Sequence, residues 1–226
     1  MKIGVLLSGC GVYDGAEIQE AVFTLLAIEE MGCEAVCIAV NSNQHHVINH
    51  ISGEEMPEQR NMMIEAARIS RGSIIEIRSI QPADIDALVI PGGFGSAKNF
   101  SSWAFHGANG SILPEVKLLL VNLINVGKPI AALCVSPVVL ALAFKDVAIS
   151  LNLSIGSLNA PSPYDIGSFQ DGIKQTGATI NDASVQEISI DSNNKIICAP
   201  CYMMDASVLT VRLNIQSALL ALKQLI

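Results

Sequence analysis

The feature of this sequence that most constrains its fold is the alternation of short apolar runs with longer stretches of helical periodicity. Short runs rich in β-branched residues are typical of buried strands, and apolar residues spaced three and four apart indicate helices. Strands that alternate with helices form a parallel, doubly wound sheet with helices on both faces. The pattern predicts strands at 2–8, 35–40, 73–77, 87–90 and 129–133, and helices at 16–31, 57–71, 113–126 and 135–145.

The last third of the chain is less regular. Two apolar runs at 185–190 and 195–199 flank Asp191 to Asn194, which favours a hairpin, and 206–225 has the pattern of a long amphipathic helix. No internal repeat, low-complexity tract or linker divides the chain. We therefore expect one α/β domain over 1–226, with a loop and helix inserted at about 41–72.

Composition and charge argue against several classes of function. Half of the residues are apolar and 15% are charged, which is typical of a packed core. The formal net charge is −8, and no basic stripe with interleaved aromatic residues indicates nucleic-acid binding. No apolar segment reaches the roughly 18 residues of a membrane span. The six cysteines lie in or beside apolar runs and no cleavable leader is recognisable, so we expect a reduced, cytoplasmic protein.

The residues that follow the strands carry most of the functional information, because ligands bind such sheets beyond the carboxyl ends of the strands. Cys134 follows one predicted strand and precedes a helix, which is the arrangement of a nucleophile elbow. We expect the helix N-terminus to stabilise its thiolate and the N–H of Val135 to face an oxyanion. Gly92 and Gly93 follow another strand, and their N–H groups would complete the oxyanion hole. A free cysteine buried in apolar packing is the alternative.

Two glutamates lie near the start of the first helix. Glu17 is suited to interact favourably with the helix dipole. Glu20 shares a helix face with Ala16 and Thr24 that points toward the carboxyl edge of the sheet, so its carboxyl could reach the thiol there. Burial would raise the pKa of this carboxyl and let it move protons near neutral pH. A simple dipole partner is the alternative for Glu20 as well.

Other patterns indicate chemistry less strongly. Cys198 and Cys201 have C-x-x-C spacing but follow a predicted strand, so we interpret them as strand-end cysteines rather than a redox pair or a zinc site. The four histidines lie in polar loops, and His45 and His46 are typical of solvated surface. The glycines at 92–95 lack the full dinucleotide-binding pattern.

Several longer stretches of the sequence resemble one family. They are Ile3 to Gly15, Val47 to His50, Arg60 and Asn61, Ala66 to Ile69, Pro91 to Asn99, Gly127 to Pro129, and Asn194 to Ile196. On these stretches the sequence is similar to the ElbB-type proteins, also called isoprenoid biosynthesis glyoxalase or enhancing lycopene biosynthesis protein. These proteins belong to the ThiJ/PfpI branch of the class I glutamine amidotransferase-like fold, and the resemblance runs over essentially the whole chain.

The resemblance implies a single flavodoxin-like domain with Cys134 as the elbow cysteine and Glu20 as the glutamate placed against it. It also implies a homodimer with a weak, glutathione-independent glyoxalase activity that requires no metal or cofactor. In the implied mechanism the thiolate attacks a small reactive carbonyl, a 2-oxoaldehyde, and a carboxylate moves a proton between adjacent carbons. Water then releases a hydroxy acid, so that glyoxal gives glycolate and methylglyoxal gives lactate.

The chain departs from the wider superfamily where a histidine often stands. Neither the run 130–133 before the elbow nor the run 199–202 after the late strand contains one. A Cys–His–Glu glutaminase is therefore disfavoured, and glyoxalase turnover would be slow because Glu20 alone handles the protons. Ser136 stands where glycine is usual and is expected to crowd the site. The alternative function is a redox-sensing or regulatory binding protein that uses Cys134.

The candidate substrate-binding residues are Gly92, Asn99 and Arg60. Asn99 and Lys98 follow the glycine-rich turn, and Arg60 opens the inserted helix. An arginine beside the cleft would hold a carboxylate product or a phosphate. For Lys98, a charge on the helix surface is an equally good interpretation.

Overall fold

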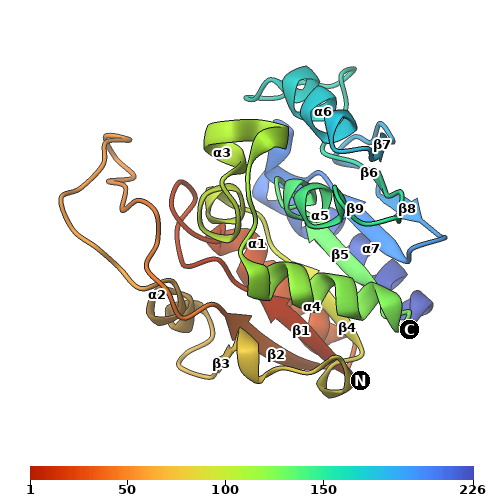
Figure 1. Cartoon of the computed structure of the whole chain (residues 1–226), viewed down its shortest axis with the longest axis horizontal. Helices are drawn as coiled ribbons and strands as arrows, with labels where there is room; N and C mark the ends of the chain where they lie inside the picture. The colour runs from red at the N-terminus through yellow and green to blue at the C-terminus, as the bar shows by residue number, and fades with distance from the viewer.

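A seven-stranded sheet forms the centre of the computed structural model, which describes all of residues 1–226 (Figure 1). The strand order is β3-β2-β1-β4-β5-β9-β8, and every neighbouring pair is parallel except the antiparallel pair β8–β9. This confirms the predicted doubly wound, mainly parallel sheet. The strands are β1 Lys2–Leu6, β2 Glu34–Ala39, β3 Ile75–Glu76, β4 Ala87–Ile90, β5 Ile130–Leu133, β8 Ser189–Asp191 and β9 Ile196–Ala199.

The topology places a ligand crevice at β1. From β1 the chain first builds β2 and β3 on one side and then returns to place β4 on the other side. Such a reversal is the topological switch point at which doubly wound folds bind ligands, beyond the carboxyl ends of the strands. The turns after β1, β4 and β5 therefore meet at one edge of the sheet.

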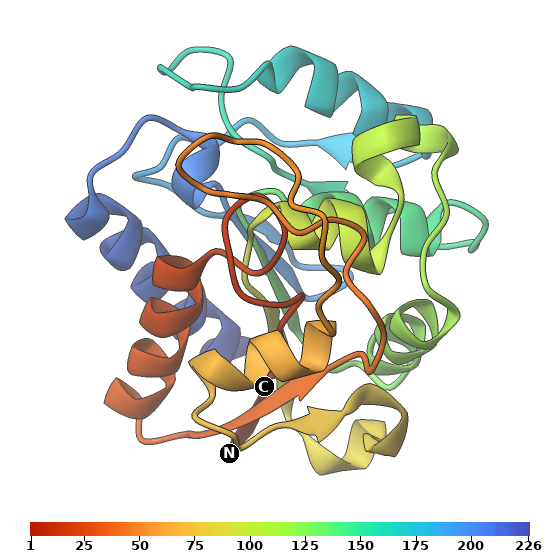
Figure 2. The same ribbon diagram turned by 90° about the vertical axis from the view of Figure 1, so that its left-hand side faces the viewer.

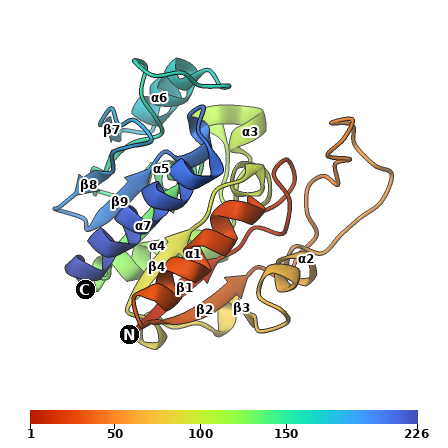
Figure 3. The same ribbon diagram turned by 180° about the vertical axis from the view of Figure 1, so that it is seen from behind.

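Helices cover both faces of the sheet. α1 (Ile18–Glu30) and α7 (Val208–Leu225) pack against each other on one face, as Figure 3 shows from behind. α4 (Pro114–Asn125) and α5 (Pro137–Phe144) pack together on the other face. Every residue of α5 is buried, so the chain between β5 and α5 lies deep in the molecule. None of the helices combines the length and apolar character that crossing a membrane would require.

Several predicted boundaries were wrong by a few residues. The inserted helix α2 spans Met62–Ile69 instead of 57–71, because the side chain of Asn61 caps it by accepting the Ile64 N–H at 3.1 Å. β3 has only two residues because a 3₁₀ turn, Ile77–Ser79, begins directly after it. The predicted hairpin is confirmed as β8–β9, with shorter strands.

The sequence pattern missed a group of short elements outside the main sheet. They are a π-helical turn at Ser96–Phe100, α3 (Trp103–His106), α6 (Ile166–Gln175), and the two-stranded sheet of β6 (Asn152–Leu153) and β7 (Thr179–Ile180). His106 therefore ends a helix and does not lie in a loop as predicted. The segment 41–61 forms a long loop beyond the edge of the sheet, and it faces the viewer in Figure 2.

Candidate active site

Cys134 lies at a sharp turn between β5 and α5. Its backbone φ is +56°, in the left-handed region that costs a non-glycine residue roughly 1 kcal/mol or more. The Cys134 N–H donates to Ala199 O at 2.8 Å, which continues the β5–β9 ladder up to the turn. The backbone therefore has the nucleophile-elbow geometry that the sequence predicted.

The carboxyl group of Glu20 lies against the Cys134 thiol. Glu20 is completely buried, its Oε2 accepts the Gly92 N–H at 2.9 Å, and its Oε1 accepts the Tyr202 N–H at 3.2 Å. The Cys134 sulfur and Glu20 Oε2 both lie beside Gly92, and the thiol is close enough to lower the pKa of this carboxyl group. Burial, followed by the charge of Glu17, raises the pKa of Glu20 to about 8. Of the two interpretations of Glu20, the geometry supports contact with the thiol.

Glu17 is the N-cap of α1, which explains how Glu20 is positioned. Its carboxylate accepts the Glu20 N–H at 2.6 Å. Burial raises the pKa of Glu17 as well. The predicted dipole role of Glu17 is therefore confirmed as a cap, and the same side chain lines the pocket beside Cys134.

The expectation of a low pKa for the thiol was wrong. Burial, and then the charge of Glu20, raise the pKa of Cys134 well above its usual value, although the N–H groups of Gly93 and Val135 oppose this. Desolvation disfavours a thiolate, and a carboxylate next to it adds like-charge repulsion. α5 begins only at Pro137, three residues after the cysteine. In the resting site the proton therefore remains on sulfur.

Backbone N–H groups surround the sulfur atom. Of the three residues predicted to form an oxyanion hole, Gly93 and Val135 direct their N–H groups at Cys134, whereas the N–H of Gly92 donates to Glu20 Oε2 instead. Gly93 has a φ of +95°, which favours glycine at this turn. A Cβ atom on Gly92 would lie only 2.8 Å from the Cys134 sulfur, so glycine is needed there for a close approach. An oxyanion hole in these N–H groups stays a prediction.

A pocket of about 20 Å³ borders Cys134, which is enough volume for one water molecule. A larger cavity of about 400 Å³ lies next to it, and the two share four lining residues, Val12, Glu17, Tyr164 and Tyr202. Neither tyrosine was predicted from the sequence. Tyr202 lies in the 3₁₀ turn Cys201–Met203 shortly after β9 and could have been found from its place near a strand end, whereas Tyr164 lies in an irregular segment without a pattern. Desolvation by burial raises the pKa of Tyr164 to about 12, so it stays protonated.

Ser136 does not crowd the site as predicted. Its hydroxyl donates to Pro91 O at 2.7 Å and lies 2.9 Å from the Ser96 hydroxyl, so the side chain connects the elbow to the turn after β4. Its φ of −62° and ψ of −20° are ordinary for any residue. Glycine is therefore not required at this position.

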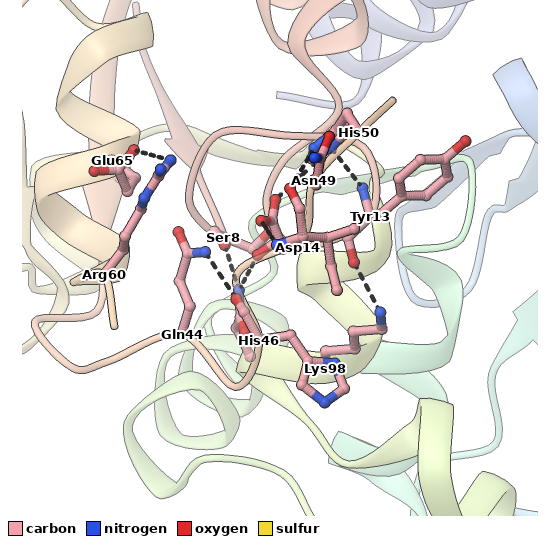
Figure 4. A network of polar contacts seen from close by, with 12 residues as sticks. Ser8, Tyr13, Asp14, Gln44, His46, Asn49, His50, Arg60, Glu65 and Lys98 are labelled. Atoms are coloured by element: carbon pink, nitrogen blue, oxygen red, sulfur yellow. Dashed lines mark hydrogen bonds and ion pairs between the residues drawn. The ribbon is translucent and has the colours of Figure 1, made fainter. Parts of the chain in front are cut away.

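Asn99 and Arg60, two of the predicted substrate-binding residues, are engaged elsewhere. The amide nitrogen of Asn99 donates to Ser8 O and Asp14 O, each at 2.8 Å, so Asn99 holds loops together. Arg60 pairs with Glu58 at 2.5 Å and lies 3.8 Å from Glu65. Neither Asn99 nor Arg60 lines the Cys134 pocket, and Figure 4 shows Arg60 beside Glu65 and away from Lys98.

The remaining cysteines are free thiols. Cys198 lies within β9, and Cys201 is buried near Cys134 with its N–H bonded to Asn214 Oδ1 at 3.0 Å. Burial raises the pKa of both, to about 12 for Cys198. No group of three or more His, Cys, Asp or Glu side chains is arranged to hold a metal ion.

Comparisons with known proteins agree with this geometry. No protein-family model matches the chain. The human glutamine amidotransferase-like class 1 domain-containing protein 3, mitochondrial, is 34% identical over 207 residues, which cover 91% of this chain and 76% of that protein. The crystal structure of an isoprenoid biosynthesis protein with an amidotransferase-like domain from Ehrlichia chaffeensis is 35% identical, with a TM-score of 0.89 over 100% of this chain and 99% of the other.

A glyoxalase III from Candida albicans superposes with a TM-score of 0.59 at 13% identity, over 98% of this chain and 97% of that one. At this identity the match shows a shared fold only. The human relative, by contrast, has both the identity and the coverage that establish kinship. The chain therefore belongs to the family of glutamine amidotransferase-like class 1 domain-containing proteins.

Proposed function

We propose that this protein is a glyoxalase-like cysteine enzyme that converts small 2-oxoaldehydes to hydroxy acids without glutathione. The observation that carries the proposal is the buried Glu20 carboxyl group, held by the N–H groups of Gly92 and Tyr202 and placed beside the Cys134 sulfur. A nucleophile and an acid–base group in direct contact are the minimum that this reaction needs. The name of the Candida relative and the ElbB-type resemblance support the same class of reaction.

The reaction begins with attack of the Cys134 sulfur on the aldehyde carbon. Glu20 takes the thiol proton and passes it to the carbonyl oxygen, which gives a hemithioacetal. Glu20 then removes the proton on that carbon and returns it to the adjacent carbon through an enediol, which leaves a thioester. Water displaces the sulfur, so that a hydroxy acid leaves and the thiol is restored. The N–H groups of Gly93 and Val135 would stabilise the oxyanions.

The pKa of Glu20 fits this sequence of proton transfers. A carboxyl group with a pKa of about 8 can both accept and donate protons near neutral pH, which a carboxyl with its ordinary pKa of 4.5 does poorly. Its carboxylate form is the one that accepts the thiol proton. Glu20 can therefore act first as the base and then as the acid, so these steps do not need a histidine.

The size of the pocket favours very small substrates. The 20 Å³ pocket holds a single water molecule, and glyoxal is larger than water. Glyoxal therefore enters only when the side chain of Tyr164 or Tyr202 moves aside. Both tyrosines also line the neighbouring 400 Å³ cavity, which provides the approach to the site. We therefore expect glyoxal to be a better substrate than methylglyoxal.

The redox-sensing alternative gains no specific support from the site. Peroxide oxidises thiolates, and burial together with Glu20 keeps the pKa of Cys134 high. The homodimer and the cytoplasmic location stay predictions. A role linked to isoprenoid biosynthesis belongs to the same proposal and is supported by the name of the Ehrlichia relative.

The proposal is tested by following glyoxal consumption and glycolate formation in Cys134→Ala. We expect turnover to fall to the background rate, because no other group can form the hemithioacetal. Cys198→Ala is the matched control, since Cys198 is equally buried in the neighbouring strand but does not line the pocket. Retention of turnover in Cys134→Ala would reject the proposal.

A further inference from the structure

A second cavity, separate from the Cys134 pocket, lies between the loop 41–61, the turn after β4, and helices α3 and α6. Its volume is about 430 Å³, within the range of cavities that bind small organic ligands. Of its lining residues, only Phe94 also borders the Cys134 pocket. The proposed catalytic function leaves this cavity without a role.

The walls of the cavity are mainly apolar, and four of the nine lining residues are aromatic. Tyr13, Phe94, Trp103 and Phe169 contribute rings from four different segments, and Ile48 and small residues complete the lining. Aromatic rings pack favourably on one another at edges and faces. The composition of the walls therefore fits a flat aromatic group.

Lys98 is the only charged residue that lines the cavity. Its ammonium group donates to Tyr13 O at 2.9 Å and lies 5.7 Å from the centre of the Phe94 ring, as part of the network in Figure 4. Lys98 is half-buried, and no carboxylate lies within ion-pairing distance of it. Asp14 and Glu55 are near enough to affect its pKa, but neither lines the cavity. Two of the three ammonium protons thus remain available to an anion.

The surrounding contacts hold this arrangement in place. The Tyr13 N–H donates to His50 Nε2 at 3.2 Å, and the two rings stack with centroids 4.9 Å apart. Asp14 Oδ2 accepts the Ile48 N–H at 2.7 Å, which attaches the loop 41–61 to the turn after β1. The cavity is therefore preformed, which lowers the entropic cost of binding a ligand.

From these features we propose that the cavity is a binding site for a small aromatic carboxylate, with its ring between the aromatic walls and its carboxylate on Lys98. The single positive charge of Lys98 balances a singly charged carboxylate, whereas a doubly charged phosphate would keep one charge without a partner in the cavity. The site is distinct from the Cys134 pocket and does not depend on the proposed catalytic activity.

Trp103 is the only tryptophan of the chain and lies in the wall of the cavity, so its fluorescence reports binding directly. The probe is phenylacetate, with phenylacetamide as the neutral analogue and acetate as the anion without a ring. We expect phenylacetate to change the Trp103 emission with saturation, and both analogues to bind at least about tenfold more weakly. Equal binding of phenylacetamide, or no saturable response to phenylacetate, would overturn the proposal.

Two variants sharpen the test, with binding measured by calorimetry. Lys98→Met keeps most of the apolar stem and removes the charge, so affinity for phenylacetate should fall about tenfold or more. Lys128→Met is the matched control, because Lys128 is also half-buried and donates to the backbone carbonyls of Pro82 and Ile85 far from this cavity. Unchanged affinity in Lys98→Met, in protein that remains folded, would contradict the proposal. Binding should persist in Cys134→Ala, which separates this site from the catalytic one.

Discussion

The two sites on either side of Phe94 are built in opposite ways. The Cys134 pocket has little volume, about 20 Å³, but its cysteine stands at the end of β5 beside the carboxyl group of Glu20 from the first turn of α1. The Lys98 cavity has about 430 Å³ and one charge, and its walls come from a loop, a π-helical turn and short helices. The reactive side chains and the space for a larger ligand therefore lie in different parts of the molecule.

This difference follows from what each kind of segment can do. Parallel strands hold their carboxyl ends at fixed spacing, so groups placed there keep their mutual distances and can exchange protons. Irregular segments enclose cavities more readily, because their side chains are not packed at the regular spacing of a sheet. A substitution in one site should therefore leave the turnover or the ligand affinity of the other site unchanged.

The largest effect is expected for Glu20→Gln. An amide cannot take the thiol proton, so kcat/KM for glyoxal should fall by about 10²- to 10⁴-fold, the usual contribution of an acid–base group. In the wild type, kcat/KM should rise with pH through about 8, because the carboxylate form of Glu20 accepts the proton. The variant should lose this rise, which a pH–rate profile with glyoxal measures.

Glu29→Gln is the control for this change, because Glu29 is exposed on the same helix. It should leave both the rate and the pH profile as in the wild type. Phenylacetate affinity at the Lys98 cavity should be unaffected in both variants. A Glu20→Gln enzyme with the wild-type pH profile would assign the proton transfer to another group.

The contrast between the sites also explains what the sequence could and could not predict. Cys134 and Gly93 were identified because strand ends can be located from apolar runs, and the topology brings those ends together. Glu20 was identified from its helix face and from the family resemblance. The Lys98 cavity was missed because Trp103 lies on a four-residue helix, which is too short to show an apolar period, and because the other walls come from segments far apart in the sequence. The pKa of Cys134 was predicted in the wrong direction because burial depends on packing around α5, which no local pattern reveals.

The next largest effect is expected for Asn99→Ala. The change leaves Ser8 O, Asp14 O and the His45 N–H without their partner in the interior, which should lower the free energy of unfolding by about 2–4 kcal/mol. Urea denaturation measures this loss. Because Asn99 supports the loop beside Lys98, phenylacetate binding should weaken while glyoxal turnover per folded molecule is retained.

Asn109→Ala, at an exposed position on a neighbouring turn, is the control and should leave stability within about 0.5 kcal/mol of the wild type. If Asn99→Ala instead lost turnover at full stability, Asn99 would contact substrate after all, as the sequence analysis expected.

A smaller effect on stability is expected for Gly92→Ala, in the Cys134 pocket. The added methyl group would clash with Cys134 Cβ and Glu20 Oε2 and would lie 2.8 Å from the Cys134 sulfur, and overpacking of this kind costs about 1–3 kcal/mol. Glyoxal turnover should fall because the methyl group separates Cys134 from Glu20, while phenylacetate affinity stays unchanged. In the control Gly167→Ala, on α6, the nearest atom to the new methyl group is 3.4 Å away, so urea denaturation should show no loss of stability. If Gly92→Ala had the same stability and turnover as Gly167→Ala, the thiol of Cys134 and the carboxyl group of Glu20 could separate at little cost in free energy.

The smallest effect is expected for Arg60→Ala, which tests whether either site includes the base of the inserted helix. Glu65 keeps its bond to Arg68 at 2.8 Å when Arg60 is removed, and Arg60 itself is 39% exposed, so stability should change by less than about 1 kcal/mol. Glyoxal turnover and phenylacetate affinity should both stay at wild-type values, measured by the same two assays. Loss of turnover alone would require the loop 41–61 to fold over the Cys134 pocket during the reaction, because Arg60 lines neither site in this structure. That outcome would restore the anion-binding role predicted for Arg60 and would end the separation of the two sites.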